Sequence, residues 1–404
     1  MNGCPTARRA ARRAADRRRA GCTRPADRRR ALSPSRRPPP DVTPRRTTPL
    51  HGDAPTDTRW SGTGGVATIE PVTSPDTIGW GIVATGNIAR AFAADLALLP
   101  DARVTAVGSR SLESASAFAA EYAPGATTYA SYGEVADDPD VDIVYVATPH
   151  ALHYTDVLRC FDAGKPVLCE KALTLSARTS AHLVEQARRR GLFFMEAMWM
   201  RCNPLVQQIR DLVRDGGLGR VVQVRADLGF AADLPPTHRL VDPALGGSVL
   251  LDMGIYPLTF AHLMLGDPST VHAVAEISDR GIDLNTAFVL GYDDGAVAAL
   301  SCSTTGWTPC TASIAGDAGR IDVPTRFHCP QRFNLRRGDD TETFTLNTHG
   351  RGYTYEAVEA MRCLRDGLTE SPLVPLDDTL AIMRVMDTIR GQLGVRFAED
   401  DLTL

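Results

Sequence analysis

From residue 77 to residue 196, short apolar runs rich in β-branched residues alternate with longer amphipathic stretches. The apolar runs at 78–84, 102–108, 141–147, 166–169 and 192–195 predict buried strands, and the stretches at 87–99, 112–122, 153–163 and 176–190 predict helices. Strands joined through helices pair in parallel, because a parallel pair needs a crossover connection. The alternation therefore predicts an α/β fold with a doubly wound parallel sheet.

Beyond residue 196 the pattern changes to a helix at 203–214 followed by alternating stretches at 221–228, 286–292, 296–304 and 311–314. The turn at 292–295 ends in Asp-Gly, which supplies the positive φ of a hairpin between antiparallel strands. Final helices are expected at 353–367 and 377–393. We therefore expect one domain at 76–196 and a second, α+β domain at 197–404 with a large open, mostly antiparallel sheet.

Residues 1–72 differ from the rest because they have almost no large apolar side chains. They contain arginine triplets at 17–19 and 28–30 and a proline run at 38–40. Such a composition cannot offset the entropy lost on ordering, so a disordered tail is expected. Three interpretations stay open: a dispensable arm, a nonspecific binder of polyanions, and the product of an upstream translation start. We favour the last, with the native start near Val66.

Charge and cysteine content narrow the class of protein. Residues 1–60 carry 16 Arg and 5 Asp, and the whole chain carries −4, which leaves −15 for the remainder. This acidic body argues against nucleic acid as a partner. The nine cysteines form no Cys-x-x-Cys pair, which is typical of a reducing cytosol without structural zinc, so we expect no metal. We find no apolar run of the length of a secretory signal or membrane span, and expect a cytoplasmic protein that does not bind membranes.

The segment 81–89 reads Gly-Ile-Val-Ala-Thr-Gly-Asn-Ile-Ala and joins the first predicted strand to the first predicted helix. In a dinucleotide-binding fingerprint, glycines at this place let the backbone approach a pyrophosphate at the helix N-terminus. The segment therefore predicts a Rossmann-type NAD(P) site. Its candidate cofactor-binding residues are Gly81, Thr85, Gly86, Asn87 and Ile88. Ala84 replaces the usual first glycine, which is tolerated if its φ is negative.

Ser109 and Arg110 end the second predicted strand, where an NAD-preferring site carries an acid that binds the ribose hydroxyls. An acid at this place would repel a 2′-phosphate, whereas a serine and a guanidinium can bind one. We therefore expect NADP in preference to NAD. The alternative is that Arg110 is a solvated loop cation.

Only two of the 44 basic residues are lysines, Lys165 and Lys171. The pKa of a desolvated lysine is readily lowered, whereas arginine keeps its proton. Lys171 follows an apolar run and adjoins Glu170, so we expect it to be present for its chemistry. Lys165 lies in a Gly-Lys-Pro turn, where an exposed loop cation is expected.

Four motifs together resemble the glucose-fructose oxidoreductase / inositol dehydrogenase (Gfo/Idh/MocA) family. They are the segment 81–89, Val-Tyr-Val-Ala-Thr-Pro-His at 144–150, Cys-Glu-Lys-Ala at 169–172, and Gly-Gly-Ser-Val-Leu-Leu-Asp-Met-Gly-Ile-Tyr-Pro at 246–257. Glu-Ala-Met-Trp-Met-Arg at 196–201 is most similar to the dihydrodiol dehydrogenase and NADP-dependent xylose dehydrogenase branch. The family pattern is Glu-Lys-Pro, and Ala172 replaces its proline.

The resemblance implies a catalytic group of Lys171, Asp252 and Tyr256. Oxidation of an alcohol needs a group that takes the hydroxyl proton while hydride leaves carbon. Lys171 would hold and polarise the substrate oxygen, and Tyr256 would donate the proton, with Lys171 as the neighbouring cation that lowers its pKa. Asp252 would orient the substrate. If their segment is helical, Asp252 and Tyr256 face the same cleft, although Pro257 removes one helical hydrogen bond.

The resemblance also places residues around the nicotinamide and the substrate. Further candidate cofactor-binding residues are Thr148, Pro149, His150, Glu170 and Lys171. Trp199 and Arg201 are candidate substrate residues, with core packing as the equal alternative. His150 and His153 have a His-x-x-His spacing, but we expect His153 to begin a helix and neither residue to bind metal.

These observations predict an NADP-dependent oxidoreductase that acts on a secondary alcohol or hemiacetal carbon of a sugar or vicinal diol. A noncatalytic NADP-binding regulator and a reductase of a noncarbohydrate carbonyl are the alternatives. An open sheet face predicts a homodimer or higher homo-oligomer.

Overall fold

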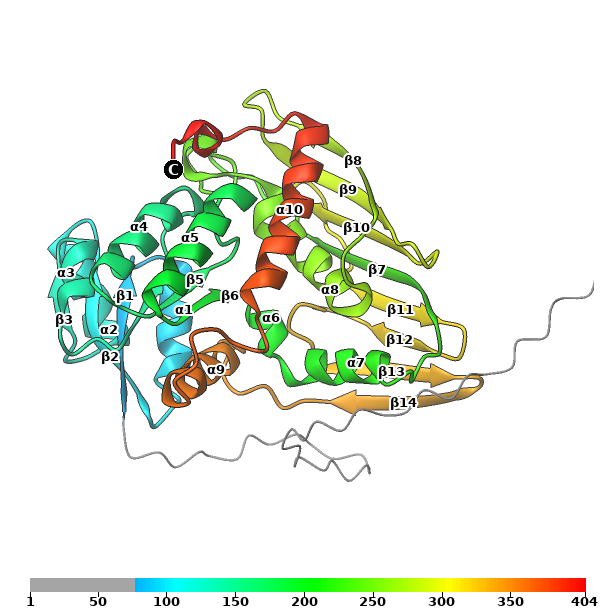
Figure 1. The fold of residues 1–404 in the computed structure, drawn as a ribbon, viewed down its shortest axis with the longest axis horizontal. Coiled ribbons are helices and arrows are strands. Elements are labelled where there is room, and N and C mark those ends of the chain that lie inside the picture. Colours follow the sequence, from blue (N-terminus) through cyan, green and yellow to red (C-terminus); the bar gives the residue numbers. More distant parts are fainter. Residues whose placement is uncertain (1–76) are drawn as a thin grey trace, which may run out of the picture. The chain divides into compact units, whose positions relative to one another are not determined.

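The computed structural model describes residues 77–404 and contains two β-sheets (Figure 1). Residues 1–76, with the expected tail and the expected start near Val66, lie outside the described part. The two sheets confirm the predicted fold class: a parallel, doubly wound sheet and a mostly antiparallel one.

Sheet A contains six strands in the order β3-β2-β1-β4-β5-β6, and all of its pairs are parallel. Its strands are β1 (Ile78–Val83), β2 (Ala102–Gly108), β3 (Thr127–Tyr129), β4 (Ile143–Val146), β5 (Val167–Glu170) and β6 (Phe194–Ala197). Its helices are α1 (Asn87–Leu96), α2 (Leu112–Tyr122), α3 (Tyr132–Asp137), α4 (His150–Asp162) and α5 (Ala177–Arg190). The elements β3 and α3 are not among the predicted ones, because three and six residues are too few to establish a period.

Local sequence explains where these elements begin and end. Ser111, Ser131 and Ser176 each accept a hydrogen bond from a first-turn backbone N–H of the following helix. Gly191 ends α5 in the left-handed conformation that glycine tolerates best. Apolar clusters cover both faces of sheet A, as a parallel sheet requires.

Sheet B contains eight strands in the order β14-β13-β12-β11-β7-β10-β9-β8, and only the β7–β10 pair is parallel. Its strands are β7 (Val221–Gly229), β8 (Thr270–Ile277), β9 (Asp283–Gly291), β10 (Val297–Ser303), β11 (Ala312–Gly316), β12 (Arg320–Val323), β13 (Arg332–Arg337) and β14 (Asp340–Thr345). The turn at 292–295 joins β9 to β10 as predicted, and the φ of Gly295 is +85°. Strands β8, β12, β13 and β14 are not among the predicted elements.

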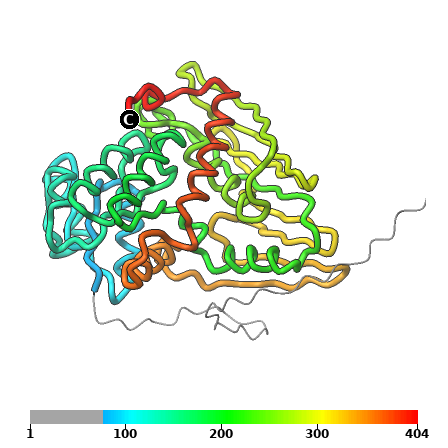
Figure 2. The backbone as a smooth tube through the Cα atoms, in the orientation of Figure 1, coloured from blue at the N-terminus to red at the C-terminus, as the bar shows by residue number. Residues whose placement is uncertain are grey.

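Helices cover one face of sheet B and leave the other face open (Figures 1 and 2). The remaining helices are α6 (Trp199–Cys202), α7 (Pro204–Arg214), η1 (Pro243–Leu245), η2 (Leu250–Gly254), α8 (Ile255–Leu265), α9 (Thr354–Arg365), α10 (Leu376–Leu393) and η3 (Ala398–Asp401). Helices α8 and α10 contact the strands of sheet B directly. On the open face, Val274 and Val289 are 72% and 48% exposed.

One hydrophobic cluster connects the two sheets, because it includes Trp80 and Tyr145 of sheet A as well as Phe288 of sheet B. The described residues, 77–404, all belong to one compact unit. The domain limits at 76–196 and 197–404 therefore stay a prediction.

Two expectations about individual segments are wrong. Lys165 is not a free loop cation, since its Nζ donates to the carbonyl oxygens of Asp138 at 2.9 Å and Val141 at 2.8 Å. The segment Pro243–Leu265 is long and apolar enough to cross a membrane, although no such segment is expected from the sequence. Of its most apolar window, 83% is buried within the structure, as in a core helix.

Candidate active site

A cavity of about 860 Å³ lies at the carboxyl ends of the strands of sheet A, between these strands and the segment that follows β7. Ligands of open α/β folds bind at this edge of the sheet, because the strand-to-helix turns converge there. Fourteen of the sixteen candidate site residues line the cavity, and Gly81 and Arg201 do not.

The turn between β1 and α1 forms one end of the cavity, through Ala84, Thr85, Gly86, Asn87 and Ile88. A Cβ added at Gly86 would meet no atom within 4 Å, so the backbone there faces open space. No side chain caps α1, which leaves the amides of its first turn without helical partners.

Two expectations for this turn need correction. The φ of Ala84 is +80°, not negative, because the chain reverses here as it leaves the sheet to enter α1. Gly81 lies within β1, where an added Cβ would approach Val135 to 2.7 Å, so its role is close packing.

Ser109 and Arg110 line the cavity at the end of β2. The Ser109 hydroxyl lies 3.3 Å from the Thr85 hydroxyl, which connects the ends of β1 and β2. Tyr132 also faces this end of the cavity, although no sequence motif includes it.

Thr148, Pro149 and His150 line the cavity after β4. Helix α4 begins at His150, so the expectation that His153 begins it is wrong. Burial, followed by the neighbouring His153, lowers the pKa of His150 to about 3. The His153 ring lies 2.8 Å from the Thr148 carbonyl oxygen and 3.0 Å from that of Ala172. Among residues 77–404, no His/Cys/Asp/Glu group has the arrangement of a metal site.

Lys171 follows β5, and its side chain is 11% exposed. Its Nζ donates to the backbone oxygen of Asp252 at 2.7 Å and to Asp252 Oδ1 at 3.1 Å. The Lys171–Ala172 peptide bond is cis. The neighbouring Glu170 accepts a 2.5 Å hydrogen bond from the Tyr145 hydroxyl, and burial raises the pKa of its carboxyl.

Asp252 lies in η2, a π-helical turn that continues into α8, and both Asp252 and Tyr256 line the cavity as predicted. Burial alone would raise the pKa of Asp252, but the cations Lys171 and Arg239 outweigh burial and hold it well below its usual value. Arg239 donates to Asp252 Oδ1 at 2.9 Å. One carboxylate oxygen therefore joins two cations.

The surroundings of Tyr256 differ from the expected ones. Lys171 Nζ lies 5.0 Å from the ring centroid, and the hydroxyl accepts a 2.6 Å hydrogen bond from Trp199 Nε1. Burial, followed by Tyr353 and Glu170, raises the pKa of Tyr256 well above 10. The expectation that Lys171 brings this pKa toward neutrality is therefore wrong, and the phenol keeps its proton.

Trp199 lines the cavity and Arg201 does not. Arg201 Nε donates to the Leu373 carbonyl oxygen at 2.8 Å, and its Nη2 contacts Asp378 at 2.6 Å. Its direction follows from α6, in which residues two positions apart point to different sides.

Several cavity residues lie outside every motif of the sequence. Besides Tyr132 and Leu152, they are Phe230, Leu234, Thr237, His238, Arg239, Leu240, Leu245 and Tyr353. Most belong to the segment after β7, which Arg280 anchors by bonds to the Val241 carbonyl oxygen at 2.9 Å and to Asp242 at 2.8 Å. A loop without periodicity or a glycine pattern gives no sequence signal for such residues.

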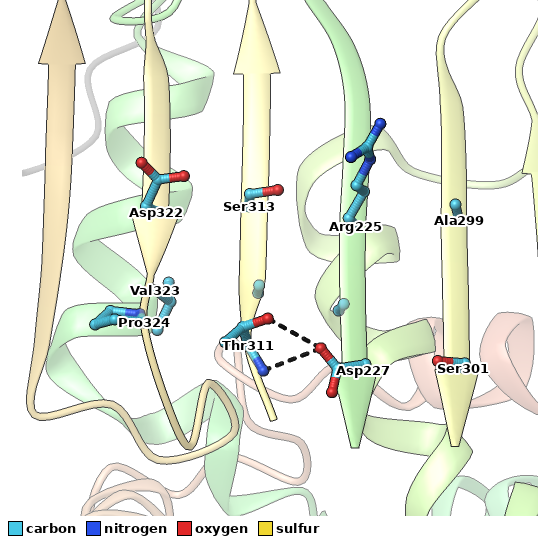
Figure 3. A pocket seen from close by; sticks show the side chains of 11 residues that line it. Arg225, Asp227, Ala299, Ser301, Thr311, Ser313, Asp322, Val323 and Pro324 are labelled. Atoms are coloured by element: carbon cyan, nitrogen blue, oxygen red, sulfur yellow. Dashed lines mark hydrogen bonds between the residues drawn. The ribbon is translucent and has the colours of Figure 1, made fainter. Parts of the chain in front are cut away.

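A second hollow of about 450 Å³ lies on the open face of sheet B, over β10, β7, β11 and β12 (Figure 3). In it, Asp227 accepts bonds from the Thr311 hydroxyl at 2.9 Å and backbone N–H at 3.2 Å. Asp227 is thus satisfied within the sheet, and the hollow contains none of the candidate catalytic residues.

Comparison with known proteins agrees with this arrangement. Residues 78–198 match the model of an oxidoreductase family with an NAD-binding Rossmann fold, and residues 206–322 match the GFO/IDH/MocA C-terminal domain. The chain is 36% identical over 335 residues to trans-1,2-dihydrobenzene-1,2-diol dehydrogenase of Bos taurus, covering 80% of this chain and 98% of that enzyme.

Two similar solved structures contain enzymes that act on sugars or carbonyls. A 3-ketoreductase from Actinomadura kijaniata, in complex with NADP and TDP-benzene, is 27% identical, with a TM-score of 0.69 over 78% of this chain and 98% of that one. An aldose-aldose oxidoreductase from Caulobacter crescentus, complexed with glycerol, is 26% identical, with a TM-score of 0.71 over 79% and 98%.

Proposed function

This chain belongs to the Gfo/Idh/MocA family of NAD(P)-dependent oxidoreductases, and we propose that it transfers a hydride between NADP and a secondary alcohol or hemiacetal carbon of a sugar or vicinal diol. The observation that carries the proposal is the common cavity: Lys171, Asp252 and Tyr256 face the same space as the uncapped N-terminus of α1. The sugar-type or diol-type substrate follows from the relatives, which act on a dihydrodiol or on aldoses.

The residues at the α1 end of the cavity fit a dinucleotide. The open space at Gly86 admits a pyrophosphate, the free first-turn amides of α1 offer donors, and the first turn contains no acidic residue. Thr148, Pro149 and His150 would then border the nicotinamide. When bound, the nicotinamide accepts or supplies the hydride.

We propose NADP in preference to NAD because of Ser109 and Arg110. Both line the cavity at the end of β2, where the adenosine ribose of a Rossmann ligand lies. A guanidinium and a hydroxyl can bind a 2′-phosphate by charge-assisted hydrogen bonds. A tenfold lower KM for NAD than for NADP would contradict this preference.

In the proposed reaction, Lys171 holds the substrate oxygen and Tyr256 exchanges a proton with it. The Lys171 ammonium polarises a carbonyl or stabilises an alkoxide through a hydrogen bond. Tyr256 keeps its proton at neutral pH and can therefore act as the donor in reduction. Asp252, ionised between Lys171 and Arg239, keeps the ammonium oriented and can accept a bond from a substrate hydroxyl.

A substrate panel tests the proposal. Aldoses, inositols and cyclic vicinal diols are assayed with NADP and NAD by nicotinamide absorbance, in both directions. Turnover with at least one secondary alcohol or its ketone is expected. Binding of NADPH without turnover of any member would contradict the proposal and favour a regulator.

Three further expectations remain proposals. The exposed apolar side chains on the open face of sheet B, including Val274 and Val289, support a homodimer that covers this face. Light scattering of the purified chain tests the proposed dimer.

The seven cysteines within residues 77–404 are free, which agrees with the proposed cytoplasmic location. We propose that the main binding partner is the small-molecule substrate, and that the protein binds neither nucleic acid nor membranes.

A further inference from the structure

Trp199 and Tyr256 share a short, buried hydrogen bond at the wall of the cavity. Trp199 Nε1 donates to the Tyr256 hydroxyl oxygen at 2.6 Å. The two residues are 7% and 6% exposed, so water competes little for this bond. They come from different parts of the chain, the start of α6 and the first turn of α8.

The neighbours of the indole hold it in one orientation. The Tyr353 ring lies 4.6 Å from it between centroids, and the His328 ring lies 5.9 Å away. On another side, a Cβ added at Gly352 would come within 3.1 Å of the indole ring, so the backbone packs against it. The N–H direction is therefore set by packing and not by the bond alone.

The direction of this bond determines where the tyrosine proton points. An indole nitrogen can only donate, so the Tyr256 oxygen must accept and its own proton must point elsewhere. Among residues 77–404, no protein acceptor takes the Tyr256 proton. Because Tyr256 lines the cavity, that proton is available to a substrate oxygen.

We infer that Trp199 is a positioning residue: its N–H fixes the Tyr256 hydroxyl with the proton toward the substrate and stabilises the phenolate that proton transfer leaves behind. The inference rests on the proposed role of Tyr256. In reduction, the Tyr256 O–H bond breaks and its proton joins the substrate oxygen, which carries the electron pair of the former carbonyl π bond. Water later returns a proton to the phenolate. The Trp199 N–H stabilises the negative charge on the Tyr256 oxygen in the same way that an oxyanion hole stabilises the charge on a substrate oxygen.

The other groups that face Tyr256 do not replace this N–H. Lys171 lies over the ring and not at the oxygen, and the His328 ring, 5.3 Å away, is held neutral at pH 7 by burial. Glu170, Asp252 and Tyr353 all disfavour the phenolate. Arg239 lies close enough to Tyr256 for that residue to favour its charged form, but the Arg239 guanidinium donates its hydrogen bond to Asp252. Trp199 is thus the hydrogen-bond donor to the oxygen.

The test removes the N–H with and without a change of shape. Trp199→Phe removes the donor and part of the ring. Benzothienylalanine, introduced at position 199, replaces the N–H by sulfur in a ring of nearly the same shape. We expect both variants to lose about 10- to 100-fold in kcat with a smaller change in KM, because a hydrogen bond to a charged group is lost in the proton-transfer step. The pH at which oxidation reaches half its plateau should rise by about 1 to 2 units.

A measurement without turnover accompanies the kinetics. The Cζ shift of labelled Tyr256, assigned by its loss in Tyr256→Phe, should begin to change at a higher pH in both variants than in the native chain. Trp307→Phe is the matched control, because Trp307 is 81% exposed and does not line the cavity. It should leave both profiles unchanged.

The outcomes separate this inference from the proposed function. If the benzothienylalanine variant keeps the native kcat and pH profile while Tyr256→Phe loses turnover, the positioning role of Trp199 is wrong and the function stands. If both position-199 variants lose kcat with unshifted profiles, Trp199 only packs and the inference is again wrong. Full turnover by Tyr256→Phe would overturn the proposed role of Tyr256 and this inference with it, whereas absence of turnover by the native chain would overturn the proposed function.

Discussion

The two ends of the cavity are built in different ways. Short segments that directly follow β1, β2 and β4 form the cofactor end, at residues 84–88, 109–110 and 147–150. The other end combines Trp199 after β6, the segment after β7, the η2–α8 turn and Tyr353 before α9. Short local motifs can predict a site that lies at successive strand ends, but they cannot predict a site that loops distant in the sequence form together.

The two ends also differ in chemistry. The cofactor end offers backbone amides and small side chains around Gly86. The other end concentrates buried charge, with Asp252 between Lys171 and Arg239. Backbone amides and small side chains suit the binding of a cofactor, and buried charges suit the chemical step. Substitutions at the cofactor end should therefore change the KM for the cofactor, and substitutions at the other end should change kcat or kcat/KM for the substrate.

Lys171→Met should have the largest effect, because Lys171 lies where the two ends meet. We expect kcat to fall by about 10³-fold or more, since both the polarising ammonium and the partner of Asp252 are lost. Binding of NADPH, measured by fluorescence titration, should change by less than about threefold. Lys165→Met is the matched control, because the bonds of Lys165 within residues 77–404 go to the Asp138 and Val141 carbonyl oxygens, away from the cavity. If Lys171→Met reduced NADPH binding as much as turnover, the two ends of the cavity would not have separate functions.

Arg239→Met tests the end without sequence motifs. The variant leaves Asp252 with one cation fewer, so we expect kcat/KM for the alcohol substrate to fall about 10- to 100-fold. The KM for NADP should stay within about twofold. Arg214→Met, at a side chain that is 68% exposed, serves as the control. If only the KM for NADP changed, Arg239 would belong to the cofactor end, and the division of the cavity into two ends would be wrong.

These differences explain what the sequence could predict. The strand-to-helix alternation predicted sheet A and most of the cofactor end, since each turn there is a local event. The motifs that resemble the family identified Lys171, Asp252 and Tyr256, and all three line the cavity. No motif could place Arg239, whose position depends on how Arg280 anchors a loop. Nor could a motif show that Arg201 turns toward Asp378, because that contact joins residues far apart in the chain.

Arg110→Ala tests the cofactor end. If Arg110 binds the 2′-phosphate, the KM for NADP should rise about tenfold and the KM for NAD should stay nearly constant, because NAD lacks that phosphate. The KM for the alcohol should not change. Adding Ser109→Asp should weaken NADP further by repulsion. If the KM for NADP and the KM for NAD rose by the same factor, Arg110 would act on the shape of the turn and not on the phosphate.

Ala84→Gly should have the smallest effect and the opposite sign. Ala84 has a φ of +80°, a conformation that costs an L-residue about 1–2 kcal/mol. Glycine relieves this cost but loses about 0.4–1 kcal/mol through the entropy of the unfolded chain, so we expect a net gain of about 0.5–1 kcal/mol in unfolding free energy. Denaturant unfolding measures it. Ala117→Gly, at an exposed position within α2, should instead cost about 1 kcal/mol. A loss at both positions would mean that Ala84 adopts a negative φ, and that the turn of the cofactor end has a different backbone.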